Sequence, residues 1–337
     1  PPPPPPPPPP PRFNDPAPTE LYTLGRSSAA SVVYKRQVPS LAAGAVATVA
    51  ALFIIANVNI GLVRADVIYK QGQQFDSQRQ WATSIELYRR ALKARQTEDH
   101  YMLFLGRGLL ERAKEAPVDA PSILGPAPTL DQILALDQTT ITQLPQEDLL
   151  RAAEAVLARA QTVNPLNTDH TANLARLYRT WAELTPGAAA QQALLDRSIA
   201  MYEAAVTLSP NNVRLWNEKA NAHLARGERE LAETMYVDNL AKDELYDETY
   251  VLLADMYSRR GDNDEVIDLL ETGIAKLAAS PARRIRPSQQ MYSYLSVAQA
   301  RAGQMDEAIE TNRTILERRP EDIAALRNLA ILLRDQG

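Results

Sequence analysis

Residues 65–98 read ADVIYKQGQQFDSQRQWATSIELYRRALKARQTE, and the architecture of most of the chain follows from the pattern in this segment. Small and large side chains alternate through it at helical spacing, at Gly72, Phe75, Trp81, Tyr88 and Ala91. Similar patterns return roughly every 34 residues, in about six and a half copies. Two antiparallel helices approach closely only where a small side chain of one faces a large side chain of the other. The pattern therefore predicts repeated helix pairs.

Glycine marks the turn inside three later copies. Gly227, Gly261 and Gly303 stand where the chain has to turn from the first helix of a pair into the second, and a glycine is favoured there. Pro320 ends the second helix of the sixth copy, because proline cannot donate a hydrogen bond inside a helix. In the incomplete last copy, a first helix with an apolar stripe has no second helix to cover it.

This pattern resembles the tetratricopeptide repeat (TPR). The resemblance implies an all-α fold, in which residues 65–337 form a right-handed superhelix (an α-solenoid) of stacked helix pairs. It also implies a concave face, lined by the first helices, that binds protein or peptide clients. The groove positions of the family correspond here to Arg176, Asn217, Asn221 and Asp255.

Asn217 and Asn221 lie one helical turn apart, so we expect both to hydrogen-bond the backbone of an extended peptide. The Lys-Asn carboxylate clamp of chaperone-binding members is not matched, because Tyr69 and Asn217 stand at positions where that clamp needs lysine. Clients that end in an acidic peptide are therefore not expected.

An insertion of residues 114–147 separates the two helices of the second pair. It carries five prolines, Pro117, Pro121, Pro126, Pro128 and Pro145. Proline breaks helices, so we expect a loop with at most one short helix, near Leu130–Leu136. A solenoid tolerates such an insertion because its stacking faces are left untouched.

The N-terminal 64 residues differ in composition from the repeats. Residues 1–34 form a proline-rich arm that opens with an uninterrupted proline run, Pro1–Pro11, which favours an extended polyproline helix. Residues 35–64 contain the uncharged segment Leu41–Val63, long enough to cross a bilayer as one helix of about 20 residues. If the protein is exported, hydroxyls of the arm are expected to carry O-linked glycan, at Thr19, Thr23, Ser27, Ser28 and Ser31.

Two functions fit an apolar helix before a solenoid. In the first, copies of the chain assemble head to tail into a cell-surface or extracellular filament of a prokaryote, because a heterologous contact need not close into a ring. The apolar helix of one copy then packs on the uncovered end of the next. The side chains expected in this contact are Leu41, Leu52, Phe53, Ile54, Ile55, Val58, Ile60, Leu62, Leu326, Leu329 and Leu333. In the alternative, residues 38–63 anchor a client-binding adaptor in a membrane.

A second resemblance covers residues 41–113. The apolar span runs into VRADVIYKQGQQFDSQRQWATSIELYRRAL and then YMLFLGRGLLERA, and it looks like the junction between the last membrane helix and the C-terminal repeats of bacterial O-antigen ligase or polymerase family proteins. The glycosyl-transfer chemistry of that family resides in a multi-span membrane domain that is absent from this sequence. The resemblance therefore implies an accessory part of a cell-envelope polysaccharide assembly system.

Composition and motifs argue against nucleic-acid binding and against catalysis. The net charge of the 337 residues is -5, and Lys and Arg are not clustered as a nucleic-acid-binding face requires. The sequence has no cysteine, so disulfides and thiolate metal sites are excluded. His100, His170 and His223 lie in different repeats without metal-ligand spacing, and His223 is expected to be a packed structural imidazole. We therefore expect a non-enzyme without cofactor or metal.

Overall fold

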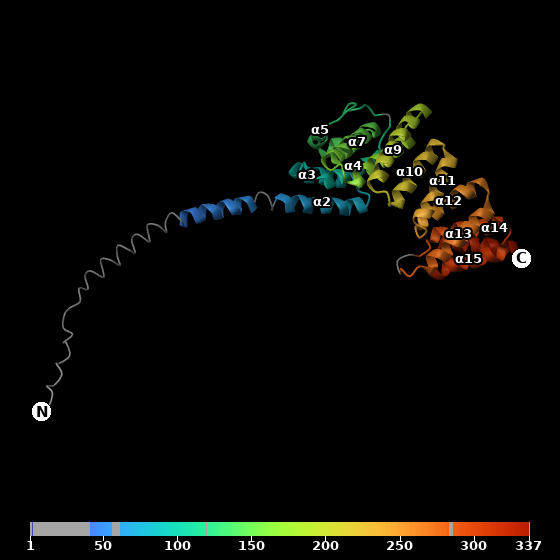
Figure 1. Ribbon diagram of the computed structural model, residues 1–337. Helices are drawn as coiled ribbons and strands as arrows, with labels where there is room; N and C mark the ends of the chain where they lie inside the picture. Colours follow the sequence, from blue (N-terminus) through green and yellow to red (C-terminus); the bar gives the residue numbers. More distant parts are fainter. Residues whose placement is uncertain (1, 3–40, 56–60, 119, 283–285, 337) are drawn as a thin grey trace. The chain divides into compact units, whose positions relative to one another are not determined.

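The computed structural model describes residues 2, 41–55, 61–118, 120–282 and 286–336 (Figure 1). The chain divides into two compact units, Pro1–Arg64 and Ala65–Gly337. Regular structure in the described residues is helical throughout, with no strand among them. The expected all-α fold is confirmed over this part of the chain.

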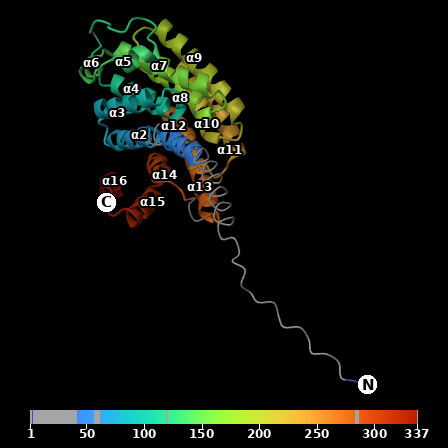
Figure 2. The same cartoon turned by 90° about the vertical axis from the view of Figure 1, so that its left-hand side faces the viewer.

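The helices follow one another in pairs, each packed on the next pair (Figures 1 and 2). The first helices are α2 (Gly61–Ser77), α4 (Asp99–Ala113), α8 (Thr168–Leu184), α10 (Val213–Arg226), α12 (Asp247–Arg260) and α14 (Gln289–Arg301). Their partners are α3 (Trp81–Ala94), α7 (Gln146–Val163), α9 (Ala188–Leu208), α11 (Arg229–Lys242), α13 (Asn263–Ala279) and α15 (Met305–Arg318). The described chain closes with α16 (Ile323–Gln336), which packs on α15.

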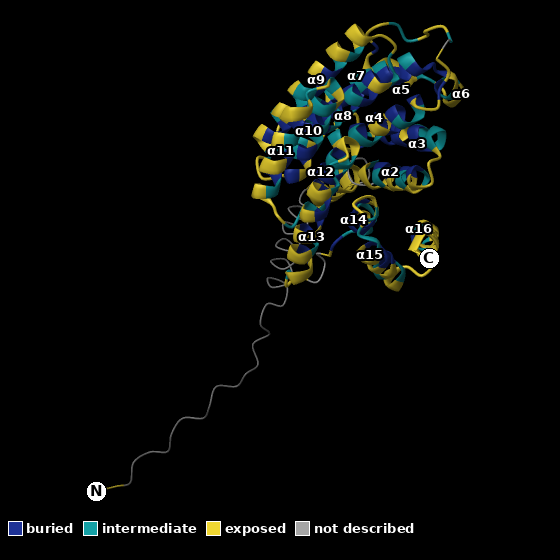
Figure 3. Cartoon of the chain, turned by 90° about the vertical axis from the view of Figure 1, so that its right-hand side faces the viewer, coloured by how far each residue is buried: buried dark blue, intermediate teal, exposed yellow. Residues whose placement is uncertain are grey.

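Small residues stand where the helices of a pair come closest. A Cβ atom built on Gly72 would lie 2.6 Å from the ring of Tyr88, and one built on Gly106 would lie 2.5 Å from Cγ of Leu157. Neither position has room for a side chain unless its neighbour moves. Buried residues accordingly lie where neighbouring helices face one another, with exposed residues on the outer surfaces (Figure 3). The pairing of small with large side chains confirms the sequence prediction.

The turn glycines adopt the conformation that their positions predicted. Gly227 ends α10 at φ 95° and Gly261 ends α12 at φ 85°, both in the left-handed region that favours glycine. Gly303 has φ 83° in the turn between α14 and α15. These turns place each second helix back against the first.

The insertion holds two short helices, α5 (Leu130–Ala135) and α6 (Gln138–Gln143), where the sequence predicted at most one. Asp137 accounts for the second, because its carboxylate accepts a hydrogen bond from the backbone N–H of Thr140 at 2.7 Å and so caps α6. Helices α5 and α6 both pack on α3, and α5 also packs on α7.

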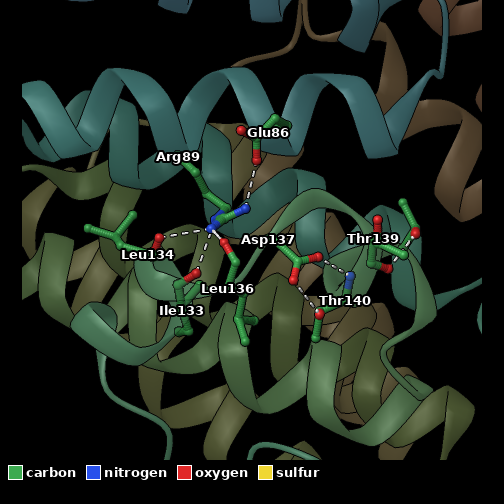
Figure 4. A network of polar contacts seen from close by, with 9 residues as sticks. Glu86, Arg89, Ile133, Leu134, Leu136, Asp137, Thr139 and Thr140 are labelled. Atoms are coloured by element: carbon green, nitrogen blue, oxygen red, sulfur yellow. Dashed lines mark hydrogen bonds and ion pairs between the residues drawn. The ribbon is translucent and has the colours of Figure 1, made fainter.

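The buried side chain of Arg89 fastens this insertion to α3 (Figure 4). Its Nε donates to the carbonyl of Ile133 at 3.0 Å, and its Nη2 donates to the carbonyls of Leu134, at 2.8 Å, and of Leu136. Nη1 pairs with Glu86 at 2.7 Å. Burial lowers the pKa of Arg89, while the charge of Glu86 acts in the opposite direction. One guanidinium thus satisfies the carbonyl groups at the end of α5.

A buried carboxylate fastens the other side of the insertion. Asp148, at the start of α7, accepts hydrogen bonds from the hydroxyl of Ser122 at 2.6 Å and from the backbone N–H groups of Ile123 and Leu124, at 2.6 and 3.0 Å. The proline-rich loop is therefore held by specific bonds rather than left loose on the surface.

In the first unit, residues 41–55 are helical and every one of them is exposed. The predicted arm beyond Pro2, with its candidate glycan positions, and the assembly positions Val58 and Ile60 lie outside the described residues. Within the described part of the chain, we find no helix that combines the length and the apolar character needed to cross a membrane.

Candidate functional site

Two adjoining hollows follow the first helices of the later repeats, and we call them together the groove. The larger, about 720 Å³, spans α8, α10 and α12, with the start of α11. The smaller, about 500 Å³, lies between α12 and α14, and Arg259 lines both. The larger hollow is lined by Arg179, Asn221, Leu224, Ala225, Arg229, Glu230, Glu233, Asp255, Met256, Arg259 and Arg260. The smaller is lined by Ser258, Arg259, Ser293, Tyr294, Val297 and Arg301.

Two of the four predicted groove residues line the larger hollow. Asn221 accepts a hydrogen bond from the hydroxyl of Tyr236 at 2.7 Å, which leaves its amide NH₂ group as a donor toward the hollow. Asp255 accepts from Arg259 at 2.7 Å and from the hydroxyl of Tyr294 at 2.8 Å. These bonds hold both side chains in place in the lining of the groove.

The prediction for Asn217 is wrong. This residue is 1% exposed, its amide donates to the hydroxyl of Thr249 at 2.7 Å, and it accepts from Asn239 at 2.8 Å. Its hydrogen bonds join α10 to α11 and α12, and its burial keeps it out of reach of a peptide. A spacing of one helical turn placed Asn217 and Asn221 on one stripe, but the next repeat covers the part of that stripe near Asn217.

Arg176, the fourth predicted residue, does not line the groove either. Its Nε and Nη2 bind the two carboxylate oxygens of Glu218 at 2.8 and 2.9 Å. Glu218 also accepts from Arg214 at 3.0 Å. This ion-pair network joins α8 to α10 and leaves the Arg176 guanidinium already paired.

Arginines outnumber carboxylates in the groove, and sequence reasoning missed them. The arginines are Arg179, Arg229, Arg259, Arg260 and Arg301, whereas the carboxylates are Glu230, Glu233 and Asp255. Arg260 is bound to Glu233 at 2.5 Å and to Asp262 at 2.6 Å. Arg229 and Arg301, in contrast, form no ion pair or hydrogen bond with the described residues. The groove therefore carries an excess of positive charge.

A cluster of aromatic side chains lies at the other end of the array, on α2 and α4. Tyr69 stacks on Tyr101 with ring centroids 4.7 Å apart, and its hydroxyl is 2.8 Å from Nε2 of His100. Arg107 lies over the ring of Phe104 at 4.7 Å. Burial raises the pKa of Tyr69, so this hydroxyl stays protonated to a more alkaline pH than an exposed tyrosine does. We interpret the cluster as packing between the first two repeats.

The remaining histidines are held in structural contacts. His170 is fully buried, with Nε2 at 2.7 Å from a carboxylate oxygen of Asp99, and His223 lies 2.6 Å from Glu228. Burial acts to raise the pKa of Asp99, but hydrogen bonds from His170 and Asn164 outweigh it and lower the pKa. Among the residues that the structure describes, no group of three side chains is placed to hold a metal ion.

Models of the tetratricopeptide repeat family match residues 69–124 and 249–282. The first segment includes most of residues 65–98, and the second includes most of α12, which lines the groove. TPR repeats are confirmed in both segments. A comparison with curated proteins gave no match. No match supports the resemblance of residues 41–113 to O-antigen ligases.

Solved structures similar to this chain include TPR proteins. One is the thermophilic TPR protein TTC0263 of Thermus thermophilus, at 14% identity and TM-score 0.43, covering 80% of this chain and 98% of that chain. Another is YrrB, described as a TPR protein with an unusual peptide-binding site, at 15% identity and TM-score 0.38, covering 54% and 84%. The solved structure of MamA is also similar, at 19% identity and TM-score 0.36, covering 50% of this chain and 88% of that chain.

Proposed function

We propose that this chain is a non-catalytic TPR scaffold that binds an extended segment of a partner protein in the groove along α8, α10, α12 and α14. The observation that carries the proposal is that the two hollows follow these first helices in succession and share the lining residue Arg259. Asn221 offers a side-chain amide to a peptide backbone, and Leu224 and Met256 offer apolar contact. Polar groups that are already held in place cost little ordering entropy when a partner binds.

A substitution that fills the groove tests this proposal. Ala225 is exposed in the larger hollow and packs against no core cluster, so we expect Ala225→Trp to fold normally and to weaken peptide binding by about tenfold or more. The measurement is fluorescence anisotropy with a labelled degenerate nonapeptide library.

The matched control is Ala200→Trp, which adds the same side chain at an exposed position of α9, a second helix of the array. Circular dichroism establishes that both variants are folded. If the two variants bind the library equally well, or if the parent chain binds no peptide, the groove is not the binding site and the proposal fails.

We also propose that copies of the chain associate through residues 41–55, as a second function compatible with the first. Leu52, Phe53 and Ile54 are 60%, 67% and 59% exposed, and a helix that is apolar on all sides is stable in water only when another surface covers it. Leu326 and Leu333 of α16 are exposed as well, whereas Leu329 packs partly against the core formed with α15 and is a weaker candidate. A prokaryotic cell surface is the location we propose for such a filament.

Substitutions in this helix separate assembly from membrane anchoring. Each apolar side chain buried in a contact contributes about 1.5–3 kcal/mol, so Leu52→Glu with Ile55→Glu is expected to dissociate assembled chains to monomers. Sedimentation velocity and negative-stain microscopy measure the change. A parent chain that is monomeric in buffer at all concentrations contradicts the assembly, and recruitment of that monomer to lipid vesicles supports the anchor instead.

A further inference from the structure

The smaller hollow of the groove has positive groups in its lining and no carboxylate among the described residues. Its guanidinium groups belong to Arg259 and Arg301, which lie on neighbouring first helices, α12 and α14. Three hydroxyl groups and one apolar side chain complete the lining, from Ser258, Ser293, Tyr294 and Val297. A volume of about 500 Å³ admits a modified amino-acid side chain.

Most of these donors have capacity left for a ligand. Arg301 and the hydroxyl of Ser258 form no hydrogen bond or ion pair with the described residues. Arg259 is bound to Asp255 at 2.7 Å, but its side chain is 77% exposed, so its remaining N–H groups can turn toward a ligand. Two other hydroxyls are already engaged, because that of Tyr294 donates to Asp255 at 2.8 Å and that of Ser293 donates to the backbone carbonyl of Gln289 at 3.1 Å. The hollow thus offers two guanidinium forks and a free hydroxyl, with one carboxylate beside it.

We propose that this hollow binds a phosphate monoester carried by a serine, threonine or tyrosine of the partner segment. A phosphate monoester has three strong acceptor oxygens and a charge of about −1.5 to −2 at neutral pH. Guanidinium groups bind such oxygens in bidentate geometry. A carboxylate brings a single charge and two oxygens, so a phosphate monoester, with three oxygens and a larger charge, uses the donors of two guanidinium groups more fully.

This inference rests on the proposed peptide-binding function and adds a preference for phosphorylated peptides. The probes are three labelled degenerate nonapeptide libraries with serine, phosphoserine or glutamate fixed at the central position. We expect the folded full chain to bind the phosphoserine library about tenfold more tightly than the serine library, and the glutamate library in between. The advantage of phosphoserine should shrink as the pH falls through about 6, where the phosphate loses its second charge.

Arg301→Met is the variant that tests the site. Arg301 is exposed and its side chain forms no ion pair or hydrogen bond with the described residues, so the substitution is not expected to affect folding. It should remove most of the advantage of phosphoserine over serine, measured as the ratio of the two affinities of the variant itself. Arg313→Met is the matched control, since Arg313 lies on α15, outside the lining of the groove.

The outcomes distinguish this inference from the function on which it rests. If the serine library binds and Ala225→Trp blocks it, but phosphoserine adds nothing, the phosphate site is refuted and the peptide groove stands. Equal binding of the glutamate and phosphoserine libraries also refutes the phosphate preference. A phosphoserine advantage that Arg301→Met leaves intact places the phosphate elsewhere. Failure of all three libraries to bind refutes both proposals.

Discussion

Arg89→Met is expected to destabilise the TPR unit by about 3 kcal/mol, a large fraction of the stability of a typical domain. Methionine keeps much of the apolar volume of arginine but donates no hydrogen bonds. The carbonyls of Ile133, Leu134 and Leu136 would then lose a donor that reaches them inside the protein, where water does not replace it. Arg89→Lys should recover only part of the loss, because an ammonium group cannot meet the carbonyls with a planar fork.

Urea denaturation followed by circular dichroism measures the change in the free energy of unfolding. Thermolysin digestion provides a second readout, because the loop of residues 114–129 should be cut faster once α5 is released from α3. The matched control is Arg90→Met, next in sequence but exposed and without a partner among the described residues. Equal stability of the Arg89 and Arg90 variants would show that the insertion does not depend on this guanidinium.

The importance of Arg89 could not be read from the sequence. Arg89 and Arg90 are adjacent and chemically identical, and helical periodicity says only that Arg89 lies near the buried face of α3, four residues after Ile85. The carbonyls that it binds lie 44 to 47 residues further along the chain. A contact of this kind depends on how the insertion folds back, and no local pattern records that.

Only part of the groove could be predicted from the sequence, and the reason is related. The position of a residue in the repeat tells which helix carries it, and this was sufficient to place Asn221 and Asp255 in the lining. The position does not tell how far the next repeat covers that helix. Asn217 was mispredicted for this reason, because it is buried against the next repeat, where its amide donates to the hydroxyl of Thr249. Arg259 was detectable in principle, since it follows Asp255 by one helical turn and shares its face.

The close helix contacts, in contrast, follow from the sequence, because they depend on side-chain size at fixed offsets. Gly106 and Leu157 belong to helices separated by the whole insertion, yet they meet as the repeat pattern requires. The insertion leaves this contact in place because it leaves the stacking faces of α4 and α7 free.

Gly106→Val is therefore expected to destabilise the unit by about 3 kcal/mol, since even a single added carbon would lie 2.5 Å from Cγ of Leu157. The helix propensity of valine exceeds that of glycine by only a few tenths of a kcal/mol, so the steric cost prevails. Leu157→Ala alone is also expected to destabilise, by about 2–5 kcal/mol, because it leaves a cavity beside Gly106.

Combining the two substitutions tests whether the contact itself sets the spacing of α4 and α7. In the double variant the valine occupies the space that Leu157 vacates, so the combined loss should be smaller than the sum of the single losses by at least about 1 kcal/mol. Urea denaturation of the four proteins gives this coupling energy. Strictly additive losses would mean that α4 and α7 move apart to accept the valine. Packing elsewhere in the pair, and not the contact at Gly106, would then set the distance between the two helices.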